Sequence, residues 1–123
     1  MAMILLVDDD VMVRETVKHI LLSAAHDVVL AQDGKRALEA FAKSRFDLVV
    51  TDIIMPEKDG IEVIAEMRRL KPQVRILAIS GGGRIGNTDF LQIAEKIGAA
   101  ATIAKPFDPD DFLVKVDQCL AIH

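Results

Sequence analysis

The chain has 123 residues, of which 51% are hydrophobic and 28% are charged, a balance typical of one globular domain rather than of a disordered segment. Its formal net charge of −4, without a basic block, argues against direct binding of nucleic acid. The chain has one cysteine, no signal peptide and no apolar run long enough to cross a membrane. We therefore expect a single cytoplasmic domain over residues 1–123, either a stand-alone protein or a piece of a longer one.

Short apolar runs alternate with amphipathic stretches along the whole chain. The runs predict five strands, over residues 3–7, 27–31, 47–51, 75–80 and 101–104. The stretches between and after them predict five helices, whose inward faces include Val13, Ala37, Ile61, Phe90 and Phe112. Asp108 is expected to be the N-cap of the last helix, with Pro109 at its first position, and Gly98 the C-cap of the fourth. Such alternation predicts an α/β fold, a doubly wound parallel sheet with helices on both faces.

Polar side chains stand at the ends of four of the five predicted strands. The first strand ends in Asp8, Asp9 and Asp10, the third in Asp52, the fourth in Ser80 and the fifth in Lys105. Ligands of open parallel sheets bind outside the carboxyl ends of the strands, so we expect these side chains to share one crevice. Carboxylate oxygens suit Mg²⁺, which would also offset the repulsion between adjacent acids. A carboxylate can accept a phosphoryl group, and a lysine and a metal can neutralise the charge of that group.

One motif narrows the function further. Residues 52–60 read "DIIMPEKDG", which has the pattern D-x-x-M-P-x-x-D-G, and they occur together with "LLVDDD", "ILAISG" and "GAAATIAKPF". With these stretches the chain resembles, over nearly its full length, the receiver domain of two-component response regulators, a chemotaxis-regulator-like family. The resemblance implies a flavodoxin-like fold, with a five-stranded parallel sheet in the order 2-1-3-4-5.

The resemblance also implies a role for each matching residue. Asp52 would be the phosphoacceptor, supplied by a sensor histidine kinase or a histidine phosphotransfer protein, in a signalling module that is not a metabolic enzyme. Mg²⁺ would be held by Asp8, Asp9, Asp52 and the backbone carbonyl of Ile54. Ser80 would be the switch hydroxyl, and Lys105 the amine that pairs with the phosphoryl group, before a Lys105–Pro106 bond that is commonly cis in the family. Asp10 is expected to be the N-cap of the first helix, and the exposed residues Arg14, Glu15 and Lys18 are the candidates to face the kinase.

The chain departs from the family pattern at two places. Thr102 stands where the family has an aromatic ring, so the predicted switch moves Ser80 and shifts the backbone without a ring flip. The glycine-rich loop 80–90 is long, and we expect it to be a mobile gate over the site.

Three other functions compete with the receiver. A haloacid-dehalogenase-like phosphatase would use Asp8 as nucleophile and Asp10 as general acid, but it leaves the motif at Asp52 unexplained. A docking pseudo-receiver would not be phosphorylated at all. A nucleotide P-loop is disfavoured because Asn87 stands where that motif needs lysine.

Two further features are given structural interpretations. Asp59 and Gly60 are expected to form a turn and the start of a helix. Arg68, Arg69 and Lys71 are interpreted as the solvated, basic end of the third helix.

Overall fold

The computed structural model describes residues 2–53, 60–80, 96 and 98–121. Its strands are β1 (Met3–Val7), β2 (Asp27–Ala31), β3 (Leu48–Asp52), β4 (Ile76–Ser80) and β5 (Ala101–Ala104). Its helices in these ranges are α1 (Val11–Ser23), α2 (Gly34–Lys43), α3 (Gly60–Leu70) and α5 (Pro109–Leu120). The expected fourth helix, the glycine-rich loop 81–90, Ile54 and Asp59 lie outside the described residues.

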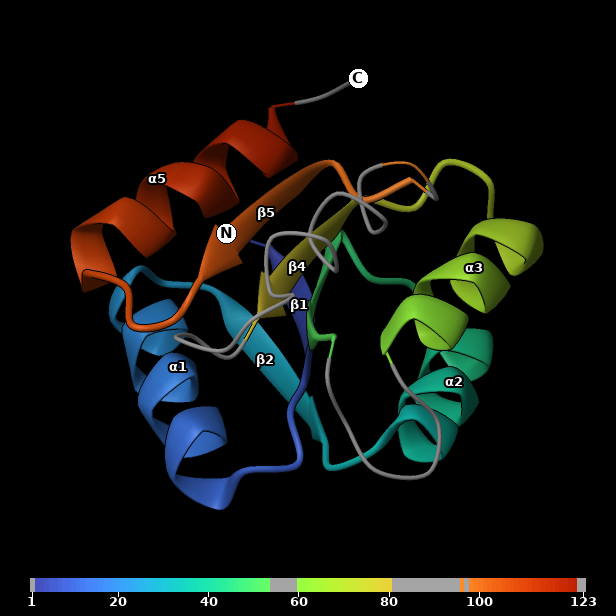
Figure 1. Cartoon of the computed structure of the whole chain (residues 1–123), viewed down its shortest axis with the longest axis horizontal. Helices are drawn as coiled ribbons and strands as arrows, with labels where there is room; N and C mark the ends of the chain where they lie inside the picture. Colours follow the sequence, from blue (N-terminus) through green and yellow to red (C-terminus); the bar gives the residue numbers. More distant parts are fainter. Residues whose placement is uncertain (1, 54–59, 81–95, 97, 122–123) are drawn as a thin grey trace.

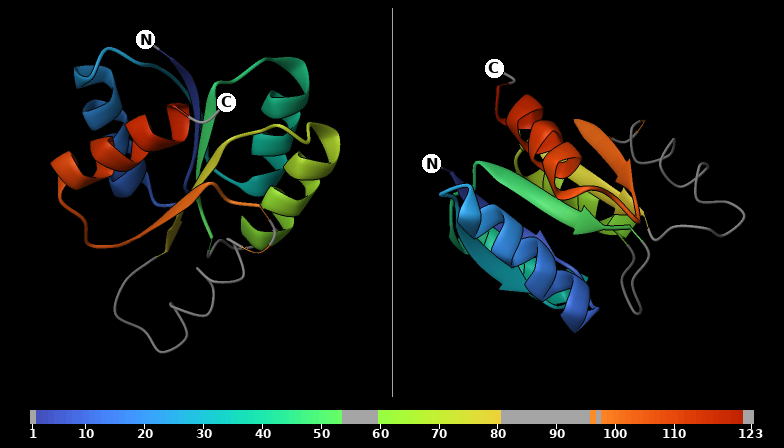
Figure 2. Two further views of the ribbon diagram at one scale, coloured as in Figure 1. Left: turned by 90° about the horizontal axis from the view of Figure 1, so that it is seen from above. Right: turned by 90° about the vertical axis from the view of Figure 1, so that its left-hand side faces the viewer.

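The five strands form one parallel sheet in the order β2-β1-β3-β4-β5, as predicted. Helices α1 and α5 cover one face of this sheet, and α2 and α3 cover the other (Figure 1; Figure 2). The strand bounds 3–7, 27–31 and 101–104 match the predictions, whereas β3 begins and ends one residue later than expected. Pairing extends to the end of β3 because the amide of Ile53 donates to the Ile79 carbonyl over 2.8 Å.

Alternate residues of the central strands enter two separate hydrophobic cores. In β1, Leu5 and Val7 face α2 and α3, whereas Ile4 and Leu6 face α1 and α5. All four are essentially buried, which accounts for the continuous apolar runs of the sequence. Full burial of such a side chain stabilises the fold by about 1.5–3 kcal/mol, so the sheet is a rigid platform for the residues at its edges.

Short polar residues begin three of the helices. The carboxylate of Asp10 accepts the amides of Met12 and Val13 at the start of α1, which confirms it as an N-cap. Asp108 caps α5, with Pro109 following it, as predicted. Asp33 caps α2 by accepting the amide of Arg36.

The basic residues at the end of α3 have structural partners. The Lys71 amine donates to the carbonyl oxygens of Phe41 (2.8 Å) and Ser44 (3.0 Å), at the end of α2. It also lies 4.6 Å from the centroid of the Phe41 ring. Lys71 is exposed at the end of α3, as interpreted, and in addition its amine satisfies carbonyl groups at the C-terminus of the neighbouring helix.

None of the helices in the described part of the chain is long and apolar enough to cross a membrane.

Candidate functional site

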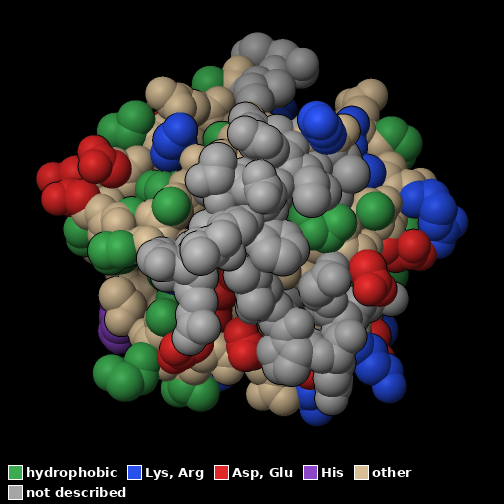
Figure 3. All heavy atoms as spheres, in the orientation of Figure 1, with side chains coloured by type: hydrophobic (Ala, Val, Ile, Leu, Met, Phe, Trp, Pro, Cys, Tyr) green, Lys and Arg blue, Asp and Glu red, His purple; other side chains and the backbone are tan. Residues whose placement is uncertain are grey.

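The carboxyl ends of β1, β3, β4 and β5 bring the predicted polar residues to one edge of the sheet. Asp8 follows β1, Asp52 ends β3, Ser80 ends β4 and Lys105 follows β5. Acidic side chains gather at the lower centre of the molecule in Figure 3, below the sheet as it is oriented in Figure 1. The sequence pattern thus located these strand ends correctly, apart from the one-residue difference at β3.

The Lys105 amine lies between two acids. Its Nζ is 2.9 Å from Oδ2 of Asp52 and 3.2 Å from Oδ2 of Asp8, and both carboxylates are buried. The backbone amide of Lys105 donates to the Ser80 carbonyl over 2.8 Å, which ties the residue to the end of β4. The Lys105–Pro106 peptide bond is cis, as the sequence resemblance implied. One ammonium therefore bridges the ends of β1 and β3.

Burial and neighbouring charges shift the pKa values of Asp8 and Lys105. Burial raises the pKa of Asp8 above its ordinary value, and the charge of Asp52 adds to this, while the Asp10 amide and Lys105 oppose it. Burial lowers the pKa of Lys105, but hydrogen bonding and charge from Asp52, together with Asp8, outweigh burial and leave that pKa raised. The amine is therefore cationic at neutral pH, as a partner for a phosphoryl group must be.

Three carboxylates at this edge form a set that fits a divalent cation. Oxygen atoms of Asp8, Asp9 and Asp52 lie within 4.8 Å of one another, with Asp9 exposed and the other two buried. Hard oxygen ligands of this kind, open to water on one side, suit Mg²⁺. The predicted fourth ligand, the carbonyl of Ile54, lies outside the described residues.

Two residues near the acids were not predicted to take part in the site. Arg14, on α1, donates from Nη1 to the backbone carbonyl oxygen of Asp8 over 2.8 Å. Gly60 donates its amide to the Ile53 carbonyl, and a Cβ at Gly60 would clash with backbone atoms of Asp52 and Ile53. The Asp-Gly pair that ends the motif was a signal for Gly60. No motif in the sequence marks Arg14, so its contact with Asp8 could not be predicted.

Comparison with known proteins identifies the family. The model of the "Response regulator receiver domain" family matches residues 4–117. The chain belongs to this family. It is 36% identical over 118 residues to the chemotaxis protein CheY of Bacillus subtilis, covering 95% of this chain and 96% of the relative. It is also 30% identical to sporulation initiation phosphotransferase F of the same organism, covering 97% and 94%.

Solved structures agree with this assignment. The receiver domain of NtrX from Brucella abortus superposes with a TM-score of 0.91 at 31% identity, covering 98% of this chain and 99% of that one. Receiver domains are signalling modules of two-component systems, which typically bind Mg²⁺ and interact with histidine kinases or phosphotransfer proteins. The family match does not favour the alternative in which Asp8 is a phosphatase nucleophile.

Proposed function

We propose that residues 1–123 form one receiver domain in which Asp52 accepts a phosphoryl group from a phosphohistidine of a sensor kinase or phosphotransfer protein. The observation that carries this proposal is the Lys105 amine, which is hydrogen-bonded to Asp52 and lies beside an acid set that fits Mg²⁺. The domain acts as a phosphorylation-controlled switch and a signalling phosphoacceptor, not as an enzyme of metabolism.

The transfer exchanges one bond for another. An Asp52 carboxylate oxygen forms a bond to phosphorus as the phosphorus–nitrogen bond of the donor breaks, and the electron pair of that bond stays with the departing imidazole. Asp8, Asp9 and Asp52, with the carbonyl of Ile54, would hold the metal, and Mg²⁺ supplies neutralisation of the charge on the phosphoryl oxygens. Lys105 is positioned to pair with one of those oxygens, and the Ser80 hydroxyl is the donor we assign to another.

The phosphodonor is proposed to dock where α1 meets the segment after β5. An apolar groove of about 340 Å³ lies there, with Met12, Val13, Phe107 and Pro109 in its walls, beside Lys105. Met12 is 78% exposed, an unusual environment for a large hydrophobic side chain. An amphipathic helix of the donor could cover it. Because the single cysteine is a free, buried thiol, we also propose a reducing, cytoplasmic location.

Intact-mass spectrometry after incubation with acetyl phosphate tests this function. The wild type is expected to gain one phosphoryl group only with Mg²⁺, and Asp52→Asn is expected to gain none. Asp47→Asn, which removes a carboxylate at the opposite end of β3, is the matched control and should behave as the wild type.

Two other outcomes would contradict the proposal. A label that survives Asp52→Asn but is lost in Asp8→Asn would favour the phosphatase-like scheme. If neither acetyl phosphate nor a panel of phosphorylated histidine proteins labels the wild type, the docking pseudo-receiver becomes the better description.

A further inference from the structure

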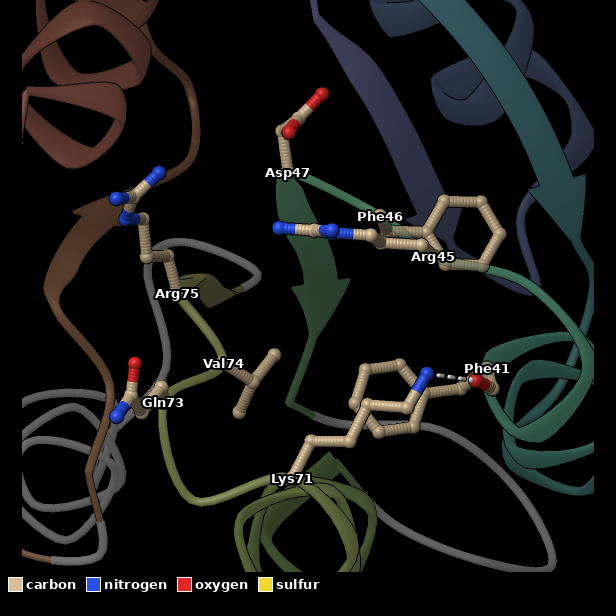
Figure 4. A pocket seen from close by; sticks show the side chains of 8 residues that line it. All are labelled: Phe41, Arg45, Phe46, Asp47, Lys71, Gln73, Val74 and Arg75. Carbon is tan, nitrogen blue, oxygen red and sulfur yellow. Dashed lines mark hydrogen bonds between the residues drawn. The ribbon is translucent and has the colours of Figure 1, made fainter.

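A polar cavity lies at the end of the sheet opposite to the acids. It has a volume of about 220 Å³, is partly open to solvent and is lined by the end of α2, the loop into β3 and the loop from α3 into β4 (Figure 4). Its walls are formed by Phe41, Arg45, Phe46, Asp47, Lys71, Gln73, Val74 and Arg75. Asp47 and Arg75 immediately precede the first residues of β3 and β4, so the cavity lies at the amino ends of strands whose carboxyl ends bear Asp52 and Ser80.

The cavity contains more positive than negative charge. Three cationic side chains and one carboxylate line it, in a protein whose formal net charge is −4. The carboxylate of Asp47 already accepts the backbone amide of Met3 over 2.8 Å. The Lys71 amine is turned toward Phe41, as Figure 4 shows, and donates to two helix carbonyls. The other two positive charges of the cavity are those of the Arg45 and Arg75 guanidinium groups.

The guanidinium groups of these two arginines have no partner among the residues that the structure describes. Within the described residues, neither guanidinium makes a hydrogen bond or an ion pair, whereas Arg14, Arg36, Arg68 and Arg69 each do. In Figure 4 the Arg45 side chain extends below Asp47, with its guanidinium toward the side on which Arg75 lies. They come from different loops, so an anion between them would join the α2–β3 connection to the α3–β4 connection.

The arrangement of donors favours one class of anion. A carboxylate has two oxygens, which a single guanidinium fork can satisfy, whereas a phosphate monoester has three terminal oxygens and up to two charges to share between two forks. Phe46 and Val74 are partly buried against the α2–α3 core and present apolar surface in the same cavity. We infer that this cavity, which we call the Arg45–Arg75 pocket, binds a small organic phosphate, with the phosphate between the guanidiniums and the organic part against Phe46 and Val74.

Titration of the ¹⁵N-labelled protein with chosen anions tests this inference independently of phosphorylation. Inorganic phosphate, ribose 5-phosphate and adenosine monophosphate are added without Mg²⁺ at constant ionic strength, with adenosine and malonate as comparisons. The organic phosphates are expected to shift the amides of residues 45–47 and 73–75 saturably, and at lower concentration than inorganic phosphate does. Adenosine should have no effect there, and malonate should bind more weakly.

Charge-removing variants locate the interaction. The double variant Arg45→Gln/Arg75→Gln is expected to bind at least about tenfold more weakly, because it loses two charge-assisted contacts. The control Lys35→Gln/Lys115→Gln removes the same charge outside the pocket and should bind as the wild type. Arg45→Lys/Arg75→Lys keeps the charge but loses the forks, so its affinity should be intermediate.

Several results would overturn the inference. They are the absence of saturable shifts up to about 10 mM ligand, equal weakening in the two Gln double variants, equal binding of malonate, or shifts confined to the vicinity of Lys105. If the Arg45→Gln/Arg75→Gln protein does not fold, the two single variants carry the same test, each with an expected weakening of about threefold.

Discussion

Arg14 donates a hydrogen bond from its guanidinium to the backbone carbonyl oxygen of Asp8 over 2.8 Å. Asp8 also accepts the amide of Asp10 through Oδ1 at 2.9 Å, and Asp10 is the N-cap of α1. The first turns of α1 are therefore bound directly to the backbone and side chain of a proposed metal ligand. A partner that binds to α1 can therefore affect the positions of Asp8 and Asp9 directly, through these hydrogen bonds.

Replacement of Arg14 should weaken Mg²⁺ binding. We expect Arg14→Ala to raise the Kd for Mg²⁺ about three- to tenfold, because the turn that carries Asp8 and Asp9 loses a charge-assisted hydrogen bond. Calorimetric titration of Mg²⁺ measures this, and Arg14→Lys should restore part of the affinity. Arg36→Ala, which breaks an exposed pair with Asp33, is the control. An unchanged Kd in a folded Arg14→Ala protein would show that the contact does not position the acids.

A methyl group at Gly60 should destabilise the fold. Its position would overlap the Asp52 carbonyl oxygen and the Cα of Ile53, which are backbone atoms and cannot rotate away. We expect Gly60→Ala to lower the free energy of unfolding by about 1–3 kcal/mol, measured by urea denaturation. Ala65→Ser, at an exposed position of the same helix, should change it by less than about 0.5 kcal/mol. Equal stability of the two variants would mean that α3 shifts freely away from β3.

Loss of the Lys71 amine should loosen the end of α2. Lys71→Met removes the donor to the carbonyls of Phe41 and Ser44 while keeping a long side chain, and we expect a cost of about 1–2 kcal/mol. Hydrogen exchange should accelerate most in the last turn of α2. Lys43→Met is the control, because Lys43 is an exposed lysine of that turn that makes no comparable contact with any residue that the structure describes. Exchange that is unchanged in Lys71→Met would show that water replaces the amine at no cost.

The N-cap of α2 should make stability depend on acid pH. The amide of Arg36 and then its side chain lower the pKa of Asp33 below its ordinary 3.8, although burial opposes the shift. A carboxyl whose pKa is lower in the folded state stabilises the fold above pH 3.8, and this contribution is lost as the pH falls through the folded-state value.

Asp33→Asn separates this charge from the cap. Asparagine can still cap the helix, so the variant should unfold at a lower temperature than the wild type at pH 6, with the difference shrinking below pH 3.8. Thermal unfolding followed by circular dichroism from pH 3 to pH 6 measures it. A difference that stays constant over this range would contradict the assignment.

The fold and most of the site could be predicted because they depend on local patterns. The apolar runs at residues 3–7 and 101–104 are each followed by a charged residue, and the acids, Ser80 and Lys105 are placed by the strands that they end or follow. Contacts made by long side chains across the fold could not be predicted in this way. The Arg14–Asp8 and Lys71–Phe41 contacts, and the presence of Arg45 and Arg75 in the wall of one cavity, depend on which helix and loop ends become neighbours, and no periodicity encodes that.

Lys105 connects the ends of four of the five strands. Its amine is hydrogen-bonded to Asp8 after β1 and to Asp52 at the end of β3, and its backbone amide donates to the Ser80 carbonyl at the end of β4. Lys105 itself directly follows β5. Four of the five strands thus meet at one residue, so we expect a new charge that draws the amine away from Asp8 to change the contacts of Lys105 with Asp52 and with the end of β4. We expect phosphorylation to be transmitted from the acids to the β4–β5 edge through these Lys105 contacts, without an aromatic ring at Thr102.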